Sequence, residues 1–267
     1  MQPKPVGGNP RKRAAMYYGL YTSAAGAHAQ NQKVEVLSNN LANVDTVGFK
    51  RELALLESRE SEAIERGQDY LGSGSLNGLG GGVRLSETAT DFSLGIMKQT
   101  GVATDLSIET PNAFFVAQRG DEQLLTRAGN FHVAADGRLL TQEGDSVLGS
   151  DLTPIQLEPG LPWRLLPGGI IEQAGDQREI GLRRPQNLRD LMKIGQNYFS
   201  AKEDALTTVP EAERRVRGGV LEMSGVNPMQ EMVELITASR GYETNIKMIQ
   251  HHDQMLGSLV NRMLRAS

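Results

Sequence analysis

The sequence contains no cysteine among its 267 residues and only four histidines. The absence of cysteine excludes a disulfide framework, thiolate metal ligands and a cysteine nucleophile, and such a chain can enter an oxidising compartment without mispairing. His251 and His252 are adjacent. On a helix they would point about 100° apart, so they cannot bind a metal as an i, i+4 pair does. We therefore expect no metal site.

Long apolar runs are also missing, and none approaches the roughly 20 residues that span a bilayer. Residues 11–29 imitate a secretory signal, because basic Arg11–Arg13 precedes a short apolar run that leads to small residues. Polar residues interrupt that run, and the periodic pattern continues beyond the cleavage point. We expect the segment to be retained, so that any export proceeds without a cleaved signal peptide.

The features of enzymes and nucleic-acid-binding proteins are scarce as well. A net charge of -4 and a sequence pI near 5.7 do not create the basic field that nucleic acid requires. No G-x-S-x-G nucleophile motif occurs, and the glycine-rich run at 72–82 lacks the spacing of a phosphate-binding loop. We expect no catalytic residue, no cofactor, no small-molecule substrate and no nucleic-acid partner.

The N-terminal part of the chain predicts a helix. Residues 1–15 are expected to be a disordered leader, and residues 16–44 carry apolar or small side chains at intervals of three and four. Small residues crowd positions 23–29, which would let another backbone approach closely. Asn39–Asn43 suits a helix end, and Gly48 supplies a turn.

The middle of the chain changes character twice. Residues 45–99 lack periodicity, and six of the eleven residues at 72–82 are glycine, which predicts an extended linker or arch that is ordered by another subunit. Residues 100–200 predict an all-β domain, with a hairpin at Asp136-Gly137, and residues 201–226 a return linker. The predicted strands are Leu106–Ile108, Phe114–Gln118, Leu124–Arg127, Phe131–Ala134, Leu139–Thr141, Ile170-Ile171 and Glu179–Leu182.

The segment 227–267 predicts a second long helix. Asn227 can cap it, Pro228 suits its first position, and Gln230 can reach back as in a capping box. An apolar stripe follows at Met229, Val233, Ile236, Ile246, Ile249, Leu256, Val260 and Met263. At about 1.5 Å per residue the helix would exceed roughly 50 Å, more than a small β domain can cover. We expect an α+β protein whose terminal helices pair as a coiled-coil-like stalk around an inserted all-β domain.

Three sequence segments resemble one known family. Residues 38–51, Ser-Asn-Asn-Leu-Ala-Asn-Val-Asp-Thr-Val-Gly-Phe-Lys-Arg, are similar to the end of the N-terminal helix in the flagellar rod and hook family. The run from Gly225 to Leu256, with Arg240-Gly241-Tyr242-Glu243 inside it, resembles the closing helix of that family. Residues 114–139 resemble its central β module. The resemblance departs at Asp45, where Asn is more usual, and at Gly241, where Ala is expected and Gly costs about 1 kcal/mol of helix stability.

The resemblance implies a non-enzymatic structural subunit of the bacterial flagellar basal-body rod. Its partners would be other copies of itself, adjacent rod and hook subunits and the flagellar type III export apparatus. Its location would be the periplasmic part of the rod, where it would help to pass motor torque to hook and filament during motility. Val220-Leu221-Glu222 after Gly218-Gly219, with the compact middle, favours an FlgF-like subunit over an FlgG-like distal rod subunit. A secreted coiled-coil protein that does not polymerise is a further alternative.

The predicted assembly interface lies on the two terminal helices. We expect these helices to become ordered when subunits associate. Its N-terminal residues are Leu20, Ala24, Ala27, Val34, Leu37, Asn39, Asn40, Leu41 and Asn43. Its C-terminal residues are Met232, Val233, Ile236, Arg240, Tyr242, Glu243, Ile246, Ile249, Asp253, Leu256 and Val260.

Overall fold

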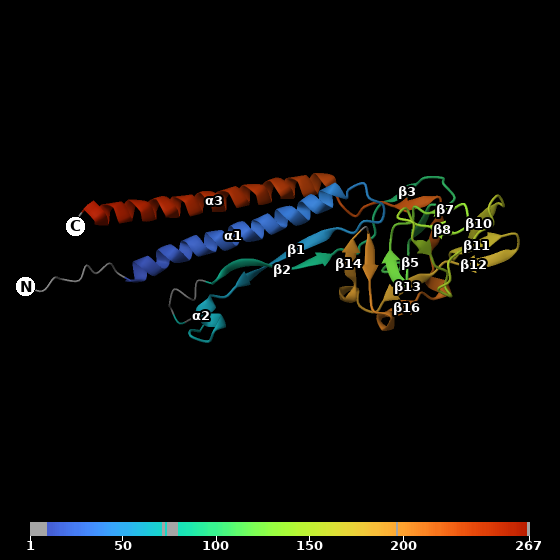
Figure 1. The fold of residues 1–267 in the computed structure, drawn as a ribbon, viewed down its shortest axis with the longest axis horizontal. Coiled ribbons are helices and arrows are strands. Elements are labelled where there is room, and N and C mark those ends of the chain that lie inside the picture. Colours follow the sequence, from blue (N-terminus) through green and yellow to red (C-terminus); the bar gives the residue numbers. More distant parts are fainter. Residues whose placement is uncertain (1–9, 71–72, 74–79, 196, 266–267) are drawn as a thin grey trace, which may run out of the picture. The chain divides into compact units, whose positions relative to one another are not determined.

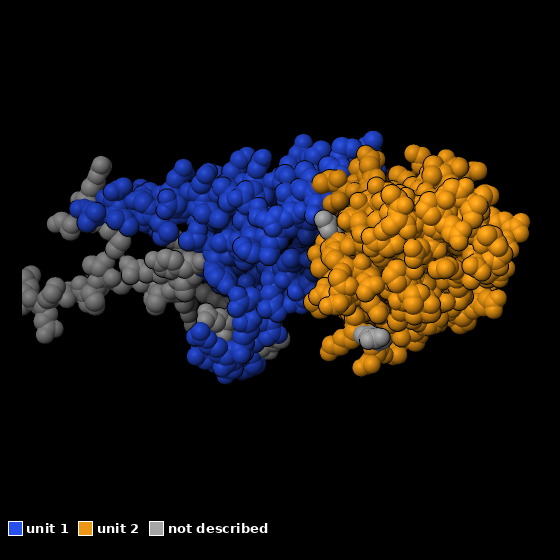
Figure 2. Space-filling model, turned by 45° about the vertical axis from the view of Figure 1, so that its right-hand side comes forward, with its two compact units in different colours: residues 1–41, 52–89, 228–267 blue, residues 42–51, 90–227 orange. Residues whose placement is uncertain are grey.

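The computed structural model describes residues 10–70, 73, 80–195 and 197–265, and the chain divides into two compact units (Figure 2). Unit 1 comprises residues 1–41, 52–89 and 228–267, and unit 2 comprises residues 42–51 and 90–227. An N-terminal helix, a C-terminal helix and a β-rich middle confirm the predicted α+β class.

Two long helices dominate unit 1 (Figure 1): α1 (Pro10–Ala42) and α3 (Pro228–Arg265). Both begin at a proline, which is favoured at the first helical position because its missing N–H would have no partner there. Helix α1 starts earlier than the sequence predicted, because residues 10–15 are helical and do not belong to a disordered leader. Alanine and long basic side chains at 11–15 favour helix once Pro10 has begun it. The leader's residues 1–9 lie outside the described residues.

The segment predicted as a linker at 45–99 contains a two-stranded sheet in unit 1. Strands β1 (Glu52–Arg59) and β2 (Gly82–Thr90) pair, with the short helix α2 (Glu62–Glu65) between them. Glu57 on β1 accepts hydrogen bonds from Arg84 and Ser86 on β2, at 2.7 and 3.0 Å. The sequence did not indicate these two strands, because neither alternates cleanly between apolar and polar residues. Most of the glycine-rich run lies outside the described residues.

Unit 2 is built on one large sheet whose strands run in the order β14-β15-β6-β5-β9-β8-β7. Strand β13 also pairs with β5 and β16. The bounds of these strands are β5 Phe114–Arg119, β6 Glu122–Thr126, β7 His132–Val133, β8 Leu139–Leu140, β9 Ser146–Val147, β13 Leu182–Pro185, β14 Met192–Gly195, β15 Tyr198–Ser200 and β16 Leu206–Thr208. The strand predicted at 179–182 is wrong, because one strand ends at Glu179 and the next, in a different sheet, begins at Leu182.

Smaller sheets complete unit 2. Strands β10 (Trp163–Leu166), β11 (Ile170–Gln173) and β12 (Asp176–Glu179) form an antiparallel three-stranded sheet. Strand β17 (Val216–Gly218) pairs with β4 (Leu106–Ile108), and β18 (Val220–Glu222) with β3 (Met97–Gln99). Short 3-10 helices lie at Leu188–Asp190, Glu203–Ala205 and Glu211–Glu213. The segment 201–226, expected to be a return linker, is therefore largely strand and short helix: β16 pairs with the nearby β13, whereas β17 and β18 pair with β4 and β3 far back in the sequence.

The core of unit 2 has two main apolar clusters. One surrounds Phe115 and Phe131, whose rings pack edge to face with centroids 5.1 Å apart. The other surrounds Phe114 and Phe199, with Phe92 against both at 5.8 and 5.4 Å. Burial of these large aromatic and aliphatic side chains stabilises the unit.

Candidate assembly interface

The two helices of unit 1 run antiparallel with a constant register. Each step of seven, four or ten residues along α1 is matched by an equal step backwards along α3. The facing pairs are Gly19 with His252, Gly26 with Asn245, Gln30 with Gly241, and Asn40 with Glu231. Lys33 adds an ion pair to Glu234 at 3.7 Å, with both side chains about a third exposed.

Glycines allow the close approach of these helices. A Cβ on Gly26 would come 3.0 Å from Asn245 Oδ1, and one on Gly19 would come 2.9 Å from the ring of His252. On α3, a Cβ on Gly241 would come 3.2 Å from Gln30 Cδ. Gly241, which departs from the pattern that the sequence resembles, therefore makes room for a side chain of the facing helix.

Asn40 joins three elements of unit 1. Its Nδ2 donates to Glu52 O at 2.8 Å and to Glu231 Oε2 at 3.3 Å, while its Oδ1 accepts from Glu52 N at 2.9 Å. Asn40 and Glu231 are both fully buried. A buried amide that satisfies its partners in only one arrangement favours a single register of α1, β1 and α3.

The structure places the predicted interface residues in three groups. Ala27, Leu37 and Asn40 are buried. Leu20, Val34, Leu41, Asn43, Ile246, Ile249 and Leu256 are half-buried. Ala24, Asn39, Met232, Val233, Ile236, Arg240, Tyr242, Glu243, Asp253 and Val260 are exposed. The first two groups include the residues that pack within unit 1, and the third remains at its surface.

The start of α3 exposes an apolar patch. Met229, Val233 and Ile236 are 69%, 58% and 51% exposed, and Met232 lies beside them at 41%. Large side chains are seldom left this exposed over successive turns unless another surface covers them. Further exposed apolar residues follow towards the end of α3 at Met248, Met255, Leu259, Val260 and Leu264.

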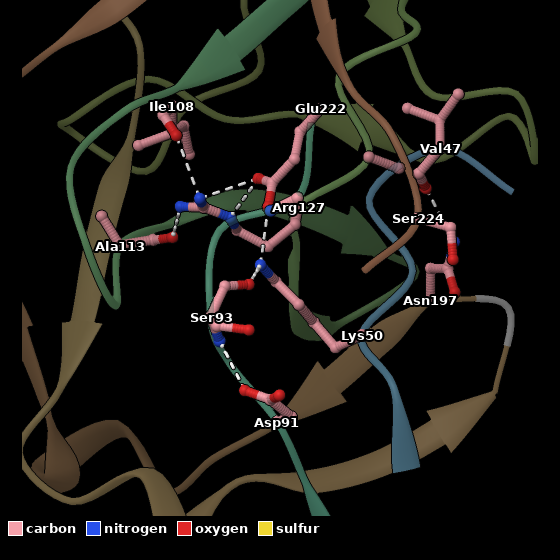
Figure 3. Close-up of polar contacts among 12 residues, drawn as sticks. Val47, Lys50, Asp91, Ser93, Ile108, Ala113, Arg127, Asn197, Glu222 and Ser224 are labelled. Carbon is pink, nitrogen blue, oxygen red and sulfur yellow. Dashed lines mark hydrogen bonds and ion pairs between the residues drawn. The ribbon is translucent and has the colours of Figure 1, made fainter. Parts of the chain in front are cut away.

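A buried ionic cluster closes unit 2 where its chain enters and leaves (Figure 3). Glu222 Oε1 accepts from Lys50 Nζ at 2.6 Å, and its Oε2 accepts from Arg127 Nε at 2.8 Å. All three side chains are nearly inaccessible to solvent. One carboxylate thus faces two cations, in an interior where an unpaired charge would be very unfavourable.

Backbone oxygens stabilise the excess positive charge. The guanidinium of Arg127 donates to the carbonyl oxygens of Ile108, Thr110 and Ala113, and Lys50 Nζ donates to Ser93 O at 2.6 Å (Figure 3). Burial lowers the pKa of Lys50 below its ordinary value, although the attraction of Glu222 opposes this shift. No local sequence pattern links Lys50, Arg127 and Glu222, which lie far apart along the chain. The sequence feature that could have indicated a buried carboxylate is Glu222 itself, which directly follows the two apolar residues Val220 and Leu221.

Gly48 occupies a turn that only glycine fits. Its φ is 68°, and an added Cβ would come 2.5 Å from Ala128 N. Its N–H donates to Glu222 O at 2.8 Å, and Asn197 Nδ2 donates to Val47 O at 2.8 Å (Figure 3). The predicted hairpin at Asp136-Gly137 is confirmed: it joins β7 to β8, with φ of 87° at Gly137.

Neither a membrane span nor a metal cluster is found among the described residues. Neither α1, α3 nor any other described helix is long and apolar enough to cross a membrane. Over the same part of the chain, no group of three or more His, Cys, Asp or Glu side chains is placed to hold a metal ion.

Comparison with known proteins gives three matching family models. They are described as "Flagella basal body rod protein" (residues 20–50), "Flagellar hook protein FlgE/F/G D1 domain" (110–176) and "Flagellar basal body rod FlgEFG protein C-terminal" (217–263). The flagellar basal-body rod protein FlgG of Borreliella burgdorferi is 32% identical over 94% of this chain and all of the relative. The chain belongs to the flagellar basal-body rod protein family.

Both rod types occur among the relatives of this rod-family chain. FlgG of Caulobacter vibrioides is 34% identical over 89% of the chain and 96% of the relative, and FlgF of the same organism is 29% identical over 91% and 97%. The family is a structural component of the rod, located in the basal body. The family models span Asn40 and Lys50 at one end and Glu222 and Glu231 at the other.

Proposed function

We propose that this chain is a structural, non-enzymatic subunit of the flagellar basal-body rod that polymerises through α1 and α3 and helps to transmit motor torque. The observation that carries the proposal is the apolar patch at the start of α3, where Met229, Val233 and Ile236 remain exposed although α1 already packs on the same helix. Covering this patch with a neighbouring subunit would bury apolar area, which favours association.

Within the rod, the helix pair would form a coiled-coil-like stalk. The matched steps of seven, four and ten residues between α1 and α3 support this proposal, because they fall close to multiples of the roughly 3.5-residue spacing that keeps one seam facing its partner. The predicted interface then has two parts. The buried and half-buried residues, with Ile246 and Ile249 among them, would hold the pair together, while Val233, Ile236 and Val260 would contact other subunits.

Export through the flagellar type III apparatus without a cleaved signal peptide is part of the same proposal. Ala27 and Ala29, near the end of the signal-like segment, are buried within α1. Cleavage there would remove Gly19 and Gly26, which make room for α3. Relatives of both rod types align along nearly the whole chain, so an FlgF-like subunit stays a prediction beside an FlgG-like one. Family membership argues against the secreted coiled-coil alternative.

The substitution Ile236→Asp tests the proposal. A carboxylate in the middle of the patch should prevent association, whereas Gln250→Asp places the same charge on an exposed position of the same helix. Sedimentation velocity and electron microscopy at rising concentration would measure assembly, and circular dichroism would check helix content. We expect Ile236→Asp to stay monomeric with normal helix content while the control assembles. Normal assembly of Ile236→Asp would refute the proposal.

A further inference from the structure

The outer strand of the large sheet in unit 2 carries two exposed apolar side chains. Strand β14 lies at one end of the sheet order, and among the described residues its partner strand is β15. Met192 and Ile194 are 71% and 52% exposed. Lys193 between them points to the other face, where its Nζ lies 4.2 Å from the ring centroid of Phe49. An edge strand with an apolar face is a natural docking surface.

A groove of about 530 Å³ lies beside this strand. Val116, Leu125 and Leu206 contribute apolar lining, and Met192 and Ile194 form one wall. Asp121, in the turn between β5 and β6, and Glu122, the first residue of β6, also line the groove, and both are exposed. An apolar floor with an acidic rim fits a partner segment that has apolar side chains next to a cation.

The same unit carries such a segment. Leu161 is 44% exposed, Pro162 is exposed beside it, and Arg164 on β10 has a side chain that is 73% exposed. The ion pair to Glu172 engages Arg164 through its Nε and holds the guanidinium at the surface. The strands β10, β11 and β12 lie on the opposite side of unit 2 from β14 (Figure 1).

We propose that the groove beside β14 receives residues 161–164 of a second copy of this chain. Leu161 and Pro162 would cover Met192 and Ile194, and Arg164 would meet Asp121 and Glu122. Because the two surfaces lie on opposite sides of one unit, the contact is heterologous, and repetition gives an open row of subunits and not a closed dimer. This inference rests on the proposed function, because it assumes that copies of the chain assemble. It concerns unit 2, however, and not the two long helices.

Cross-linking tests the contact directly, because the chain has no native cysteine. Full-length Leu161→Cys would be mixed with full-length Ile194→Cys and treated with a short bismaleimide. The matched control replaces Leu161→Cys by Glu211→Cys, at an exposed position of the same unit. We expect a heterodimer yield about tenfold above the control. A yield equal to the control, at concentrations where the wild-type chain assembles or at the highest soluble concentration, overturns the inference.

Charge exchange provides the second test. Like charges across an interface are strongly unfavourable, so Arg164→Glu and Glu122→Arg should each raise the concentration needed for assembly roughly tenfold. An equal mixture of the two variants should recover assembly, because a row in which the two variants alternate joins opposite charges at every contact. Arg164→Ala, with Trp163 fluorescence as a check on folding, gives an intermediate loss. Absence of recovery in the mixture overturns the contact.

The two proposals fail in different ways. If Ile236→Asp abolishes assembly while the cross-link stays at the control level, the helices assemble the chain and the groove has another occupant or none. If Ile236→Asp assembles normally while the cross-link forms, the contact in unit 2 stands and the helix proposal is wrong.

Discussion

Asn245 on α3 lies directly opposite Gly26 on α1, with its Oδ1 at 3.0 Å from the place that a Cβ of Gly26 would occupy. The pairing puts a polar side chain of one helix against the backbone of the other. A polar residue at such a position usually lowers stability but selects one register, because other registers leave it without room or partners.

Gly26→Leu should therefore separate the helices. Leucine is a good helix former, so α1 itself should be no less helical, but the side chain cannot fit against Asn245. We expect a loss of about 1–3 kcal/mol of unfolding free energy in unit 1, measured by the helical signal in urea. Gly257→Leu is the matched control, since nothing lies within 4 Å of its added Cβ. Equal stability of the two variants would contradict the close pairing.

Glu222→Gln should destabilise unit 2 severely. The substitution leaves Lys50 and Arg127 as buried cations without a carboxylate, and breaking a buried pair in this way costs about 3–5 kcal/mol. Trp163, the single tryptophan, packs against the core of unit 2 and reports its unfolding by fluorescence in urea. Glu109→Gln serves as control, because it breaks an exposed pair with Arg217 and should cost less than about 1 kcal/mol. A small loss in both variants would show that the cluster contributes little.

Gly48→Ala should lower the unfolding free energy of unit 2 by more than the strain of a positive φ alone would. Gly48 has φ of 68° and backbone atoms of Arg127 and Ala128 at 2.5 Å from its Cβ position. Gly120 has φ of 60° but nothing within 4 Å. We expect about 1 kcal/mol for Gly120→Ala and at least about 2 kcal/mol for Gly48→Ala, by the same fluorescence measurement. Similar values for both variants would mean that the backbone around Gly48 yields easily.

The pair Arg119–Asp145 predicts a dependence of stability on acid pH. Burial tends to raise the pKa of Asp145, but its hydrogen bonds with Arg119 and Tyr198 outweigh burial and hold this pKa below its ordinary value. Between the two values the unfolded chain binds a proton that the folded chain does not. The stabilisation is therefore complete above about pH 4 and is lost as pH falls through the folded pKa.

The variant Asp145→Asn checks this dependence. It should lower the unfolding free energy at pH 7 by about 1 kcal/mol, and the difference from wild type should shrink as pH falls below about 4. Urea unfolding at pH 7, 5, 4 and 3 would measure this. A difference that does not change with pH would assign the effect to packing.

The sequence predicted the helices well and the β unit only in part. The apolar and small residues at intervals of three and four placed α1 and α3, and Pro228 marked the start of α3 to the residue. These signals are local. The pairing of β17 with β4 and of β18 with β3 is not, because short strands gain their identity from distant partners.

The candidate site shows the same division. The stripe at Ile246, Ile249 and Leu256 was predicted, and these residues are half-buried. The sequence could not distinguish them from Val233 and Ile236, which the same periodicity places on α3 but which remain exposed. Lys50 and Glu222 lie 172 positions apart, so no local pattern could pair them.

The closure of unit 2 also has a mechanical consequence. Gly48 N–H donates to Glu222 O and Gly225 N–H donates to Phe49 O, with Lys50 bonded to the carboxylate of Glu222 between them. We expect a tensile force applied at residues 42 and 227, the two ends of this unit, to fall first on these bonds. The strands beyond them lie outside the loaded path. We therefore expect these bonds to protect the sheet from strain when the unit is pulled at residues 42 and 227.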